Sequence, residues 1–427
     1  MRRHATGNGM TTALRVGIAA TAVSLVLAGC GRGDGDGGNG EPEEAAAVDE
    51  GAASGTIEVW AMGTEGEALG DFAQAFMDEN PDITVNVTAV PWDAAHDKIA
   101  TAIAGGQTPD VSMIGTTWMG EFAATGALDP TPDLIDASSF FEGAWETTNV
   151  GGTNYGVPWY VETRVLYYRT DLIPEAPTDW AGFTAAAQGA MDAGATYGTN
   201  LQPGQTGAWQ TFMPFAWQAG AQIIDEDATE FSFDTPEFVE ALTAYQSFFT
   251  EGLAPTELPQ GSLEPDFMAG KIASFVSGPW HVGILRDLDE AGMANVALAP
   301  LPEGAEEASF IGGANLAVFE DSDVRDAAWT FVEWLSQPET QVAWYAEVND
   351  LPSVASAWED PAIADDEYLG VFGEQLTSAV APPSIPTWEE VASVIDTELE
   401  RLCKSGADPQ EVATAIQQQA SSIGTGL

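Results

Sequence analysis

The sequence predicts an α/β protein with two folded regions, and two observations support this. Between Ile57 and Ile114, strand patterns alternate with helical patterns, which is typical of an α/β domain with a largely parallel sheet. The chain of 427 residues is also 45% hydrophobic and contains 14 Trp and 19 Phe, which is enough apolar material for two cores of ordinary domain size. From about Tyr167 onward, helical patterns predominate.

The first region reads as strand, helix, strand, helix, strand. Hydrophobic residues fall at helical spacing in the first helix and alternate in the second strand. A Gly105-Gly106 pair ends the second helix. In chain order, the signals are the buried run Ile57 to Trp60, the helical set Leu69, Phe72, Ala73 and Phe76, the alternating Ile83, Val85 and Val87, the helix through Ile99 and Ile103, and the strand through Val111 and Ile114.

Helices dominate the second region. Thr235-Pro236 is a typical helix start, and the stretch VRDAAWTFVEWLSQPET predicts another helix, with Pro338 opening the next. Two more helices are expected at the C-terminus. The apolar positions of the four main helices are Phe238, Leu242, Tyr245 and Phe249; Val324, Ala328, Phe331 and Leu335; Val391, Val394, Ile395, Leu399 and Leu402; and Val412, Ala415 and Ile416.

The N-terminus has the pattern of a secretory signal. Three arginines precede an uncharged run from Val16 to Ala28, which is shorter than the ~20 residues that a spanning helix needs. Leu27-Ala28-Gly29-Cys30 resembles the lipobox of bacterial lipoproteins. We therefore expect residues 1–29 to be a signal peptide and Cys30 to carry lipid, although an ordinary secretory cleavage site with an incidental cysteine is the alternative.

Residues 30–55 are rich in Gly, Ala, Asp and Glu and contain almost no large apolar side chain. Such a segment cannot bury enough surface to offset the entropy of ordering, so we expect a disordered tether. Lipid on Cys30 would hold the protein on the extracytoplasmic face of the cell membrane, provided that more than one acyl chain is attached.

Charge excludes several classes of partner. After removal of residues 1–29, the chain has nine Lys and Arg against 66 Asp and Glu, a net charge of −57. Such a polyanion repels nucleic acid, and its self-repulsion predicts that salt stabilises it. Once Cys30 is acylated, only Cys403 remains, so we expect no intrachain disulfide. No sequence motif indicates a metal or a cofactor, and we expect a monomer.

Seven phrases, in order, are similar to one family. They are PDITVNV, IAGGQTPDV, GALDPTPDL, YGVPWYVETRVLYYRTDLIP, MAGKIASFVSGPW, LPEGAEEASFIGGANLAVF and AWTFVEWLSQPETQVAWY. Together they resemble the extracellular solute-binding proteins of carbohydrate ABC importers, the family that includes maltodextrin-binding proteins. The similarity runs from about Ile57 to the C-terminus.

The resemblance implies a two-lobed, type II periplasmic-binding-protein-like fold with ligand held between the lobes. It places the N-lobe at residues 56–160 plus 312–348 and the C-lobe at residues 161–311 plus 349–427. The crossings between lobes are expected at residues 158–163, 310–315 and 349–353. Ligand would stabilise a closed state, which ABC permease subunits with a cytoplasmic ATPase would recognise.

Two tryptophans are expected to stack on a sugar. Trp280, in Gly278-Pro279-Trp280, matches a family motif whose tryptophan does so, and core packing is the alternative. Trp388 matches another family position after APPSIPTW, although it could instead staple the helix that follows.

Loops after the first and third strands supply further candidates. GTEGE places Thr64 and Glu65 at the cleft, where the carboxylate would accept hydrogen bonds from hydroxyls; the alternative is that Glu65 caps a helix. IGTTWMG places Thr117 and Trp118 at the mouth. Family members that bind oligosaccharides often carry an acid or Arg at these two positions, which argues against maltodextrin itself.

The crossings provide the remaining candidates. Glu162 lies where family members often place a ligand-binding acid, and Arg164 could instead pair with it structurally. Glycine in the second crossing permits close approach of the backbone. The full set of additional candidates is Trp159 and Glu162 in the first crossing, Gly312, Gly313 and Asn315 in the second, and Gln205 and Trp209 in the uncharged stretch QPGQTGAWQTF.

The candidate loops contain a single basic residue, Arg164, so a neutral mono- or oligosaccharide is favoured over phosphorylated or carboxylated solutes. A polyamine would also suit so acidic a protein. A secreted glycosidase is a further alternative, because two carboxylates suffice for its chemistry. No nucleophile elbow, P-loop or HExxH motif is present, so we expect a binder and not an enzyme. A sensing or adhesive lipoprotein without a transport partner also stays open.

Overall fold

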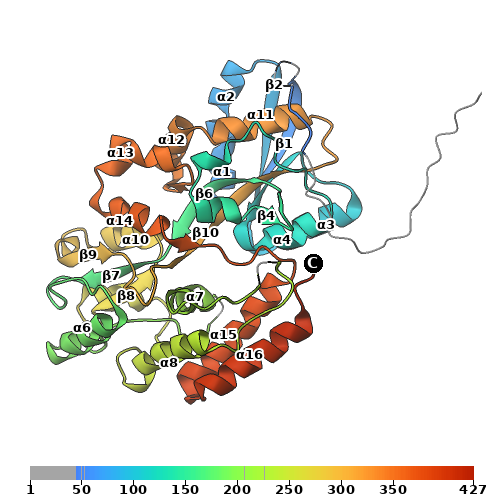
Figure 1. Cartoon of the computed structure of the whole chain (residues 1–427). Helices are drawn as coiled ribbons and strands as arrows, with labels where there is room; N and C mark the ends of the chain where they lie inside the picture. Colours follow the sequence, from blue (N-terminus) through green and yellow to red (C-terminus); the bar gives the residue numbers. More distant parts are fainter. Residues whose placement is uncertain (1–44, 50, 52, 206, 226) are drawn as a thin grey trace, which may run out of the picture. The chain divides into compact units, whose positions relative to one another are not determined.

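The computed structural model describes residues 45–49, 51, 53–205, 207–225 and 227–427 (Figure 1). The predicted signal peptide, Cys30 and most of the predicted tether lie outside these residues. The described end of the tether contacts the folded part: Arg325 Nη2 donates to the Ala46 carbonyl oxygen at 3.0 Å, and Val48 packs on a hydrophobic core. The first strand begins at Gly55, one residue before the predicted N-lobe.

The larger sheet has seven strands in the order β11-β6-β10-β3-β1-β2, with β12 paired to β10. Their bounds are β1 (Gly55–Met62), β2 (Ile83–Val90), β3 (Val111–Gly115), β6 (Val157–Thr163), β10 (Ser309–Val318), β11 (Leu351–Pro352) and β12 (Ala379–Val380). The predicted parallel pairing holds for β3-β1-β2. The sheet as a whole is mixed, because β10 runs antiparallel to both β3 and β6.

Helices near this sheet include α1 (Gly63–Phe72), α2 (Gln74–Glu79), α3 (Trp92–Gly105), α4 (Met119–Ala124), α5 (Glu142–Glu146), α11 (Arg325–Leu335) and α12 (Pro338–Val348), with 3-10 turns η2 (Thr116–Trp118) and η3 (Ala137–Ser139) and the small hairpin β4 (Asn149–Val150) and β5 (Thr153–Asn154). The single helix predicted through Phe76 is split at Ala73. The predicted end of α3 is confirmed, since Gly106 adopts the left-handed conformation (φ 59°) that glycine tolerates.

The smaller sheet is antiparallel, in the order β8-β7-β9, with β7 (Val165–Arg169), β8 (Ser274–Ser277) and β9 (Val296–Ala299). The helices of this part are α6 (Trp180–Asp192), α7 (Trp209–Gln218), α8 (Pro236–Thr250), α9 (Leu263–Met268), α10 (Trp280–Asp289), α13 (Pro361–Ala364), α14 (Glu367–Leu376), α15 (Trp388–Ser405) and α16 (Pro409–Ile423), with η4 (Gly292–Asn295) and η5 (Ala355–Glu359). Helices α7, α8, α15 and α16 pack together around one apolar core, and Figure 1 shows them near one another at the bottom of the view.

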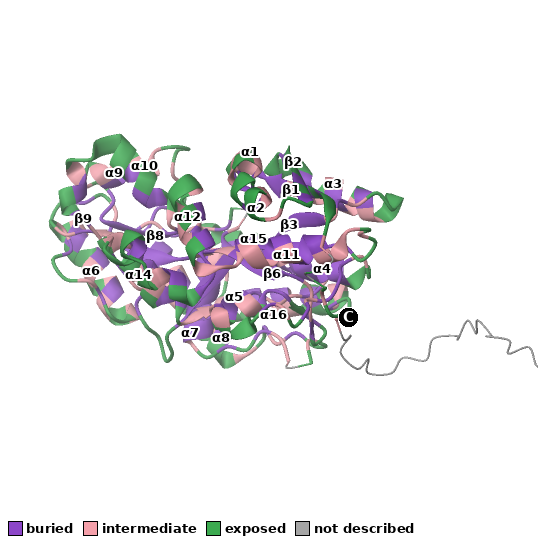
Figure 2. Cartoon of the chain, turned by 90° about the horizontal axis from the view of Figure 1, so that it is seen from above, coloured by how far each residue is buried: buried purple, intermediate pink, exposed green. Residues whose placement is uncertain are grey.

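Buried residues are concentrated on the strands, whereas the exposed residues lie mainly on the helices and loops (Figure 2). The strands β6 and β10 each contribute to more than one core. On β6, Trp159 packs in the core around β1 to β3, while Val161 packs with the smaller sheet. On β10, Leu316 packs in the first of these cores and Ile311 in the second. The strands β6 and β10, which contain the first two predicted crossings, therefore each pass from one core to another. The lobe limits themselves stay a prediction.

Gly313 shows why β10 needs glycine at this point. Its φ is +124°, and a Cβ atom there would lie 2.1 Å from the Tyr160 carbonyl oxygen of β6. Only glycine allows this conformation and this close approach without strain. Over the described residues, no helix is both long and apolar enough to cross a membrane.

Candidate functional site

A cavity of about 460 Å³ brings together three of the predicted site residues, Glu65, Glu162 and Trp280. Its wall also includes Tyr160 of β6, Tyr345 of α12, Asp350 just after α12, and the ion pair of Arg286 with Asp366 (3.3 Å). Sequence reasoning had not singled these out as site residues. The cavity thus combines one exposed indole, two phenols, four carboxyl groups and one guanidinium group. Aromatic faces and carboxylates are the groups that suit the C–H surfaces and hydroxyls of a sugar.

The sheet order explains why residues from separate loops meet at one edge. Strands β3, β1 and β2 are parallel neighbours, so the segments that follow them lie at the same edge of the sheet. Glu65 follows β1, Thr117 and Trp118 follow β3, and Trp92 follows β2. Trp92 was missed by sequence reasoning, although it follows the alternating strand directly and the same argument could have found it.

Trp92 lies beside the Glu65 loop. A Cβ atom on Gly63 would lie 2.9 Å from Trp92 Cδ1 and 3.2 Å from Glu65 Oε2, so the indole and the carboxylate flank one point. The Trp92 and Trp118 rings meet edge to face with centroids 5.8 Å apart, and Trp92 is 40% exposed. These two indoles extend the aromatic surface outward from Glu65.

The carboxyl groups of the cavity disfavour one another's charge. Burial raises the pKa of Glu65, opposed by hydrogen bonds from its own backbone N–H and from Tyr160. Burial, and then the nearby charges of Glu65 and Glu162, raise the pKa of Asp350 well above its ordinary range, although Trp344 Nε1 donates to Asp350 Oδ2 at 3.1 Å. Glu65 and Asp350 are therefore harder to ionise here than exposed carboxyl groups are.

Arg164 links Trp280 to Glu162. The guanidinium carbon lies 4.9 Å from the Trp280 ring centroid, and Nη1 lies 3.3 Å from Glu162 Oε1. Arg164 Nη2 also donates to Gln210 Oε1 at 2.7 Å. The ion pair considered as an alternative role for Glu162 is therefore present. Glu162 still lines the cavity, and a Cβ atom on Gly312 would lie 2.8 Å from its Oε1, so glycine makes room for it.

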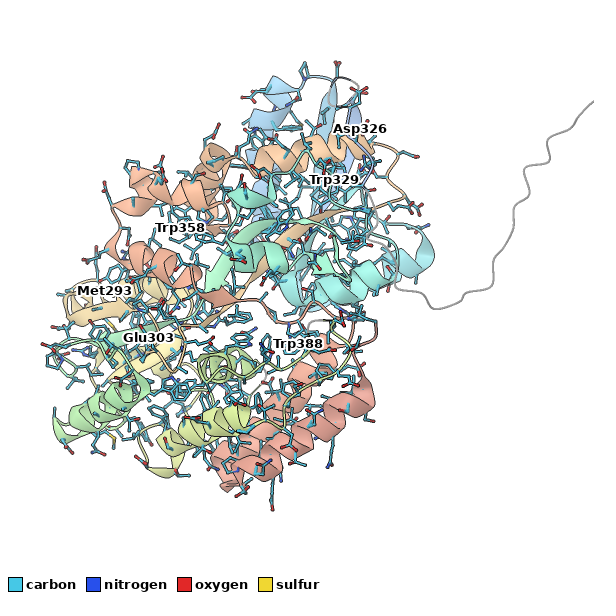
Figure 3. The ribbon with its side chains drawn as sticks, viewed as in Figure 1. Met293, Glu303, Asp326, Trp329, Trp358 and Trp388 are labelled. Carbon is cyan, nitrogen blue, oxygen red and sulfur yellow. The ribbon has the colours of Figure 1, made fainter. Side chains whose placement is uncertain are left out.

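Three predicted tryptophans have other surroundings. Trp159 is 1% exposed and stacks on Trp344 with centroids 4.9 Å apart. Trp388, labelled in Figure 3, is fully buried and packs edge to face on Trp209, which is itself 4% exposed. None of these three side chains has appreciable surface for a ligand in this conformation, so the core and helix-stapling interpretations describe them better.

The other candidates lie apart from the cavity wall. Asn315 is fully buried, where its side chain exchanges hydrogen bonds with Thr147 at 3.1 and 3.2 Å, a structural role. Gln205 is exposed. Thr64 is exposed next to Glu65, and Thr117 is half-buried next to Trp118. Their contact with ligand stays a prediction.

Residues 61–342 match the family described as bacterial extracellular solute-binding protein. The chain belongs to this family. The family predicted from the seven phrases is thereby confirmed, and this solute-binding protein has the expected α/β, two-lobed class of fold.

Named relatives of this solute-binding protein bind sugars. It is 26% identical over 369 residues to the maltotriose-binding protein of Pyrococcus abyssi (80% of this chain, 77% of that one). It is 25% identical over 390 residues to the galactooligosaccharide-binding protein of Bacillus subtilis (87% and 90%). The solved structure of the sugar-binding protein MalE from Xanthomonas citri superposes with a TM-score of 0.82 at 32% identity, covering 86% of this chain and 97% of that one.

Proposed function

We propose that this solute-binding protein captures a neutral sugar or oligosaccharide in the cavity of Glu65, Glu162 and Trp280 and delivers it to an ABC permease. The observation that carries the proposal is Trp280, which is 43% exposed and offers its ring to a cavity edged by carboxylates. A cavity of about 460 Å³ is within the usual ~300–1,000 Å³ range of small-ligand sites. The named relatives and the sugar-binding structural neighbour support the ligand class.

The aromatic surface favours an oligosaccharide over a single ring. Trp280 shares the cavity with Glu65, and Trp92, which contacts Trp118, lies beside the residues next to Glu65. An extended ligand would stack on both aromatic groups while its hydroxyls donate to the Glu65 carboxylate. Bound hydroxyls would also relieve the mutual repulsion of the cavity carboxyls by donating hydrogen bonds to them.

We further propose that lipid on Cys30 anchors the protein to the extracytoplasmic face of the membrane, in keeping with the lipobox-like LAGC. Mass spectrometry of protein from its native membrane tests this. A diacylated or triacylated N-terminal peptide beginning at Cys30 is expected, and a mature N-terminus elsewhere contradicts the anchor.

A thermal-shift screen over mono- and oligosaccharides tests the ligand class. At least one neutral saccharide should raise Tm in the wild type and much less in Trp280→Ala. Leu288→Ala is the matched control, since Leu288 lies on the same helix, is 47% exposed and does not line the cavity. A Tm response to polyamines alone contradicts the sugar proposal. Release of reducing ends from any bound oligosaccharide favours a glycosidase instead.

A further inference from the structure

Next to Trp280 lies a chain of three polar side chains, two of them buried and one half-buried, that the proposed sugar site does not use. Ser277 Oγ is 2.8 Å from His281 Nδ1, and His281 Nε2 is 3.1 Å from Glu264 Oε1. Ser277 ends β8, His281 lies in the first turn of α10, and Glu264 belongs to α9. Ser277 and His281 are 7% and 8% exposed. The chain therefore ties together three elements at the point where the backbone turns into Trp280.

The turn that carries Trp280 is held from two directions. From one side, Ser277 is bonded to His281; from the other, the Tyr167 hydroxyl donates to the Gly278 carbonyl oxygen at 2.7 Å. The indole lies over Gly278 so closely that a Cβ atom there would be 2.1 Å from Trp280 Cζ3. The orientation of the indole thus depends on where this turn is fixed.

His281 is well placed to fix the position of this turn. Its ring packs against Phe275 and Tyr167, with centroids 5.0 and 6.0 Å away, and its centroid is 5.9 Å from that of Trp280. A carboxylate can only accept, so Nε2 carries the proton that is donated to Glu264, and Nδ1 accepts from the Ser277 hydroxyl. This arrangement uses the neutral imidazole.

We propose that His281 is a positioning residue for Trp280. Through its hydrogen bonds to Ser277 and Glu264, His281 holds the indole over the cavity, and protonation of His281 weakens ligand binding. The ligand part of this proposal rests on the proposed sugar site. The charged groups that face His281 are Glu264 from α9 and Arg164, with the Tyr167 phenol from β7. An imidazolium would add a second positive charge near Arg164, whose guanidinium stacks on Trp280 and pairs with Glu162.

Burial lowers the pKa of His281, which favours the neutral form, while Glu264 opposes this. The neutral, positioning state is therefore present at neutral pH and is lost as pH falls through the depressed pKa of His281. Replacing Glu264 by Gln removes the opposing charge and should move this transition to lower pH.

The first test needs no ligand. Protein labelled with 5-fluorotryptophan gives a fluorine NMR resonance for Trp280, which Trp280→Phe assigns. As pH falls from 8, the resonance should show one titration step that disappears in His281→Gln, whose amide is neutral and can still bond to Ser277. The step should move to lower pH in Glu264→Gln. A resonance that does not respond, or a step that persists in His281→Gln because it comes from the cavity carboxyls, overturns the proposal.

The second test uses the best saccharide from the thermal-shift screen. The wild-type Kd should rise several-fold from pH 8 to pH 5. The rise in Kd over the same pH range should be clearly smaller in His281→Gln. Ser277→Ala, which leaves the His281–Glu264 bond intact, should raise Kd modestly at pH 8. Parallel pH profiles for the wild type and His281→Gln overturn the positioning role. If no saccharide binds at any pH, the proposed sugar function fails, and the NMR result still decides the role of His281.

Discussion

Trp280 and Trp388 each begin a helix directly after a proline-containing segment, yet their indole rings have opposite surroundings. Trp280 is 43% exposed at the cavity, with Arg164 on its face. Trp388 is fully buried against Trp209, which in turn packs edge to face on Phe310 with centroids 5.2 Å apart. A similar position at a helix start therefore leaves one indole exposed at a cavity and places the other in the core.

Burial of Trp388 has a cost at its indole nitrogen. Within the described residues, Trp388 Nε1 has no hydrogen-bond partner, although it is buried. An unpartnered donor of this kind costs about 1–3 kcal/mol. The apolar contacts of the indole must outweigh this cost for Trp388 to stabilise the core.

The largest expected effect is the loss of stability in Trp388→Ala. Removing a fully buried indole leaves a cavity in the core and should lower the free energy of unfolding by about 3–5 kcal/mol. Urea denaturation of the ligand-free protein measures this, with Trp280→Ala as the control that should change it little. A Trp388→Ala protein of wild-type stability that no longer binds saccharide would show that Trp388 is a ligand contact after all.

A smaller effect is expected at the outer aromatic pair. Trp92→Ala should weaken binding of an oligosaccharide by roughly fivefold, about 1 kcal/mol, and leave a mono- or disaccharide unaffected, because only a long ligand reaches this indole. Affinities for a series of chain lengths measure this. An equal loss for every length would place Trp92 at the same subsite as Trp280.

The smallest effect concerns Asp350. Its pKa is raised in the folded protein, so its contribution to stability is fully present below the pKa of the unfolded state and is lost as pH rises through the folded pKa. Asp350→Asn should therefore raise the apo Tm at pH 7 by roughly 1–3 °C, and the gain should vanish near pH ~4. The asparagine Oδ1 can still accept from Trp344. A Tm gain that is independent of pH contradicts this origin.

Local patterns account for much of the fold. The strands and helices from β1 to β3 follow from hydrophobic periodicity and from Gly106, and the start of α8 follows from Thr235-Pro236, where the Thr235 side chain accepts from the Phe238 N–H. The antiparallel placement of β10 was not predicted, since it depends on pairing with distant segments. The split between α1 and α2 was not predicted either.

The site was predicted in part for the same reason. The position of Glu65 at the cleft could be predicted because Glu65 follows a strand that the hydrophobic run Ile57 to Trp60 identifies. The burial of Trp388 depends on Trp209 and Phe310, which approach it only in the folded chain. Asp350 lies in a predicted crossing, but its raised pKa depends partly on Glu65, which is more than a whole lobe away in the sequence.

Isothermal titration calorimetry of the wild type, Trp280→Ala and Leu288→Ala with one neutral oligosaccharide tests the central claim most directly. The wild type and Leu288→Ala should bind it with equal affinity, and Trp280→Ala should bind at least roughly tenfold more weakly with its apo Tm unchanged. Equal affinity in all three proteins, or no binding of any neutral saccharide to the wild type, would contradict a sugar site built on Trp280.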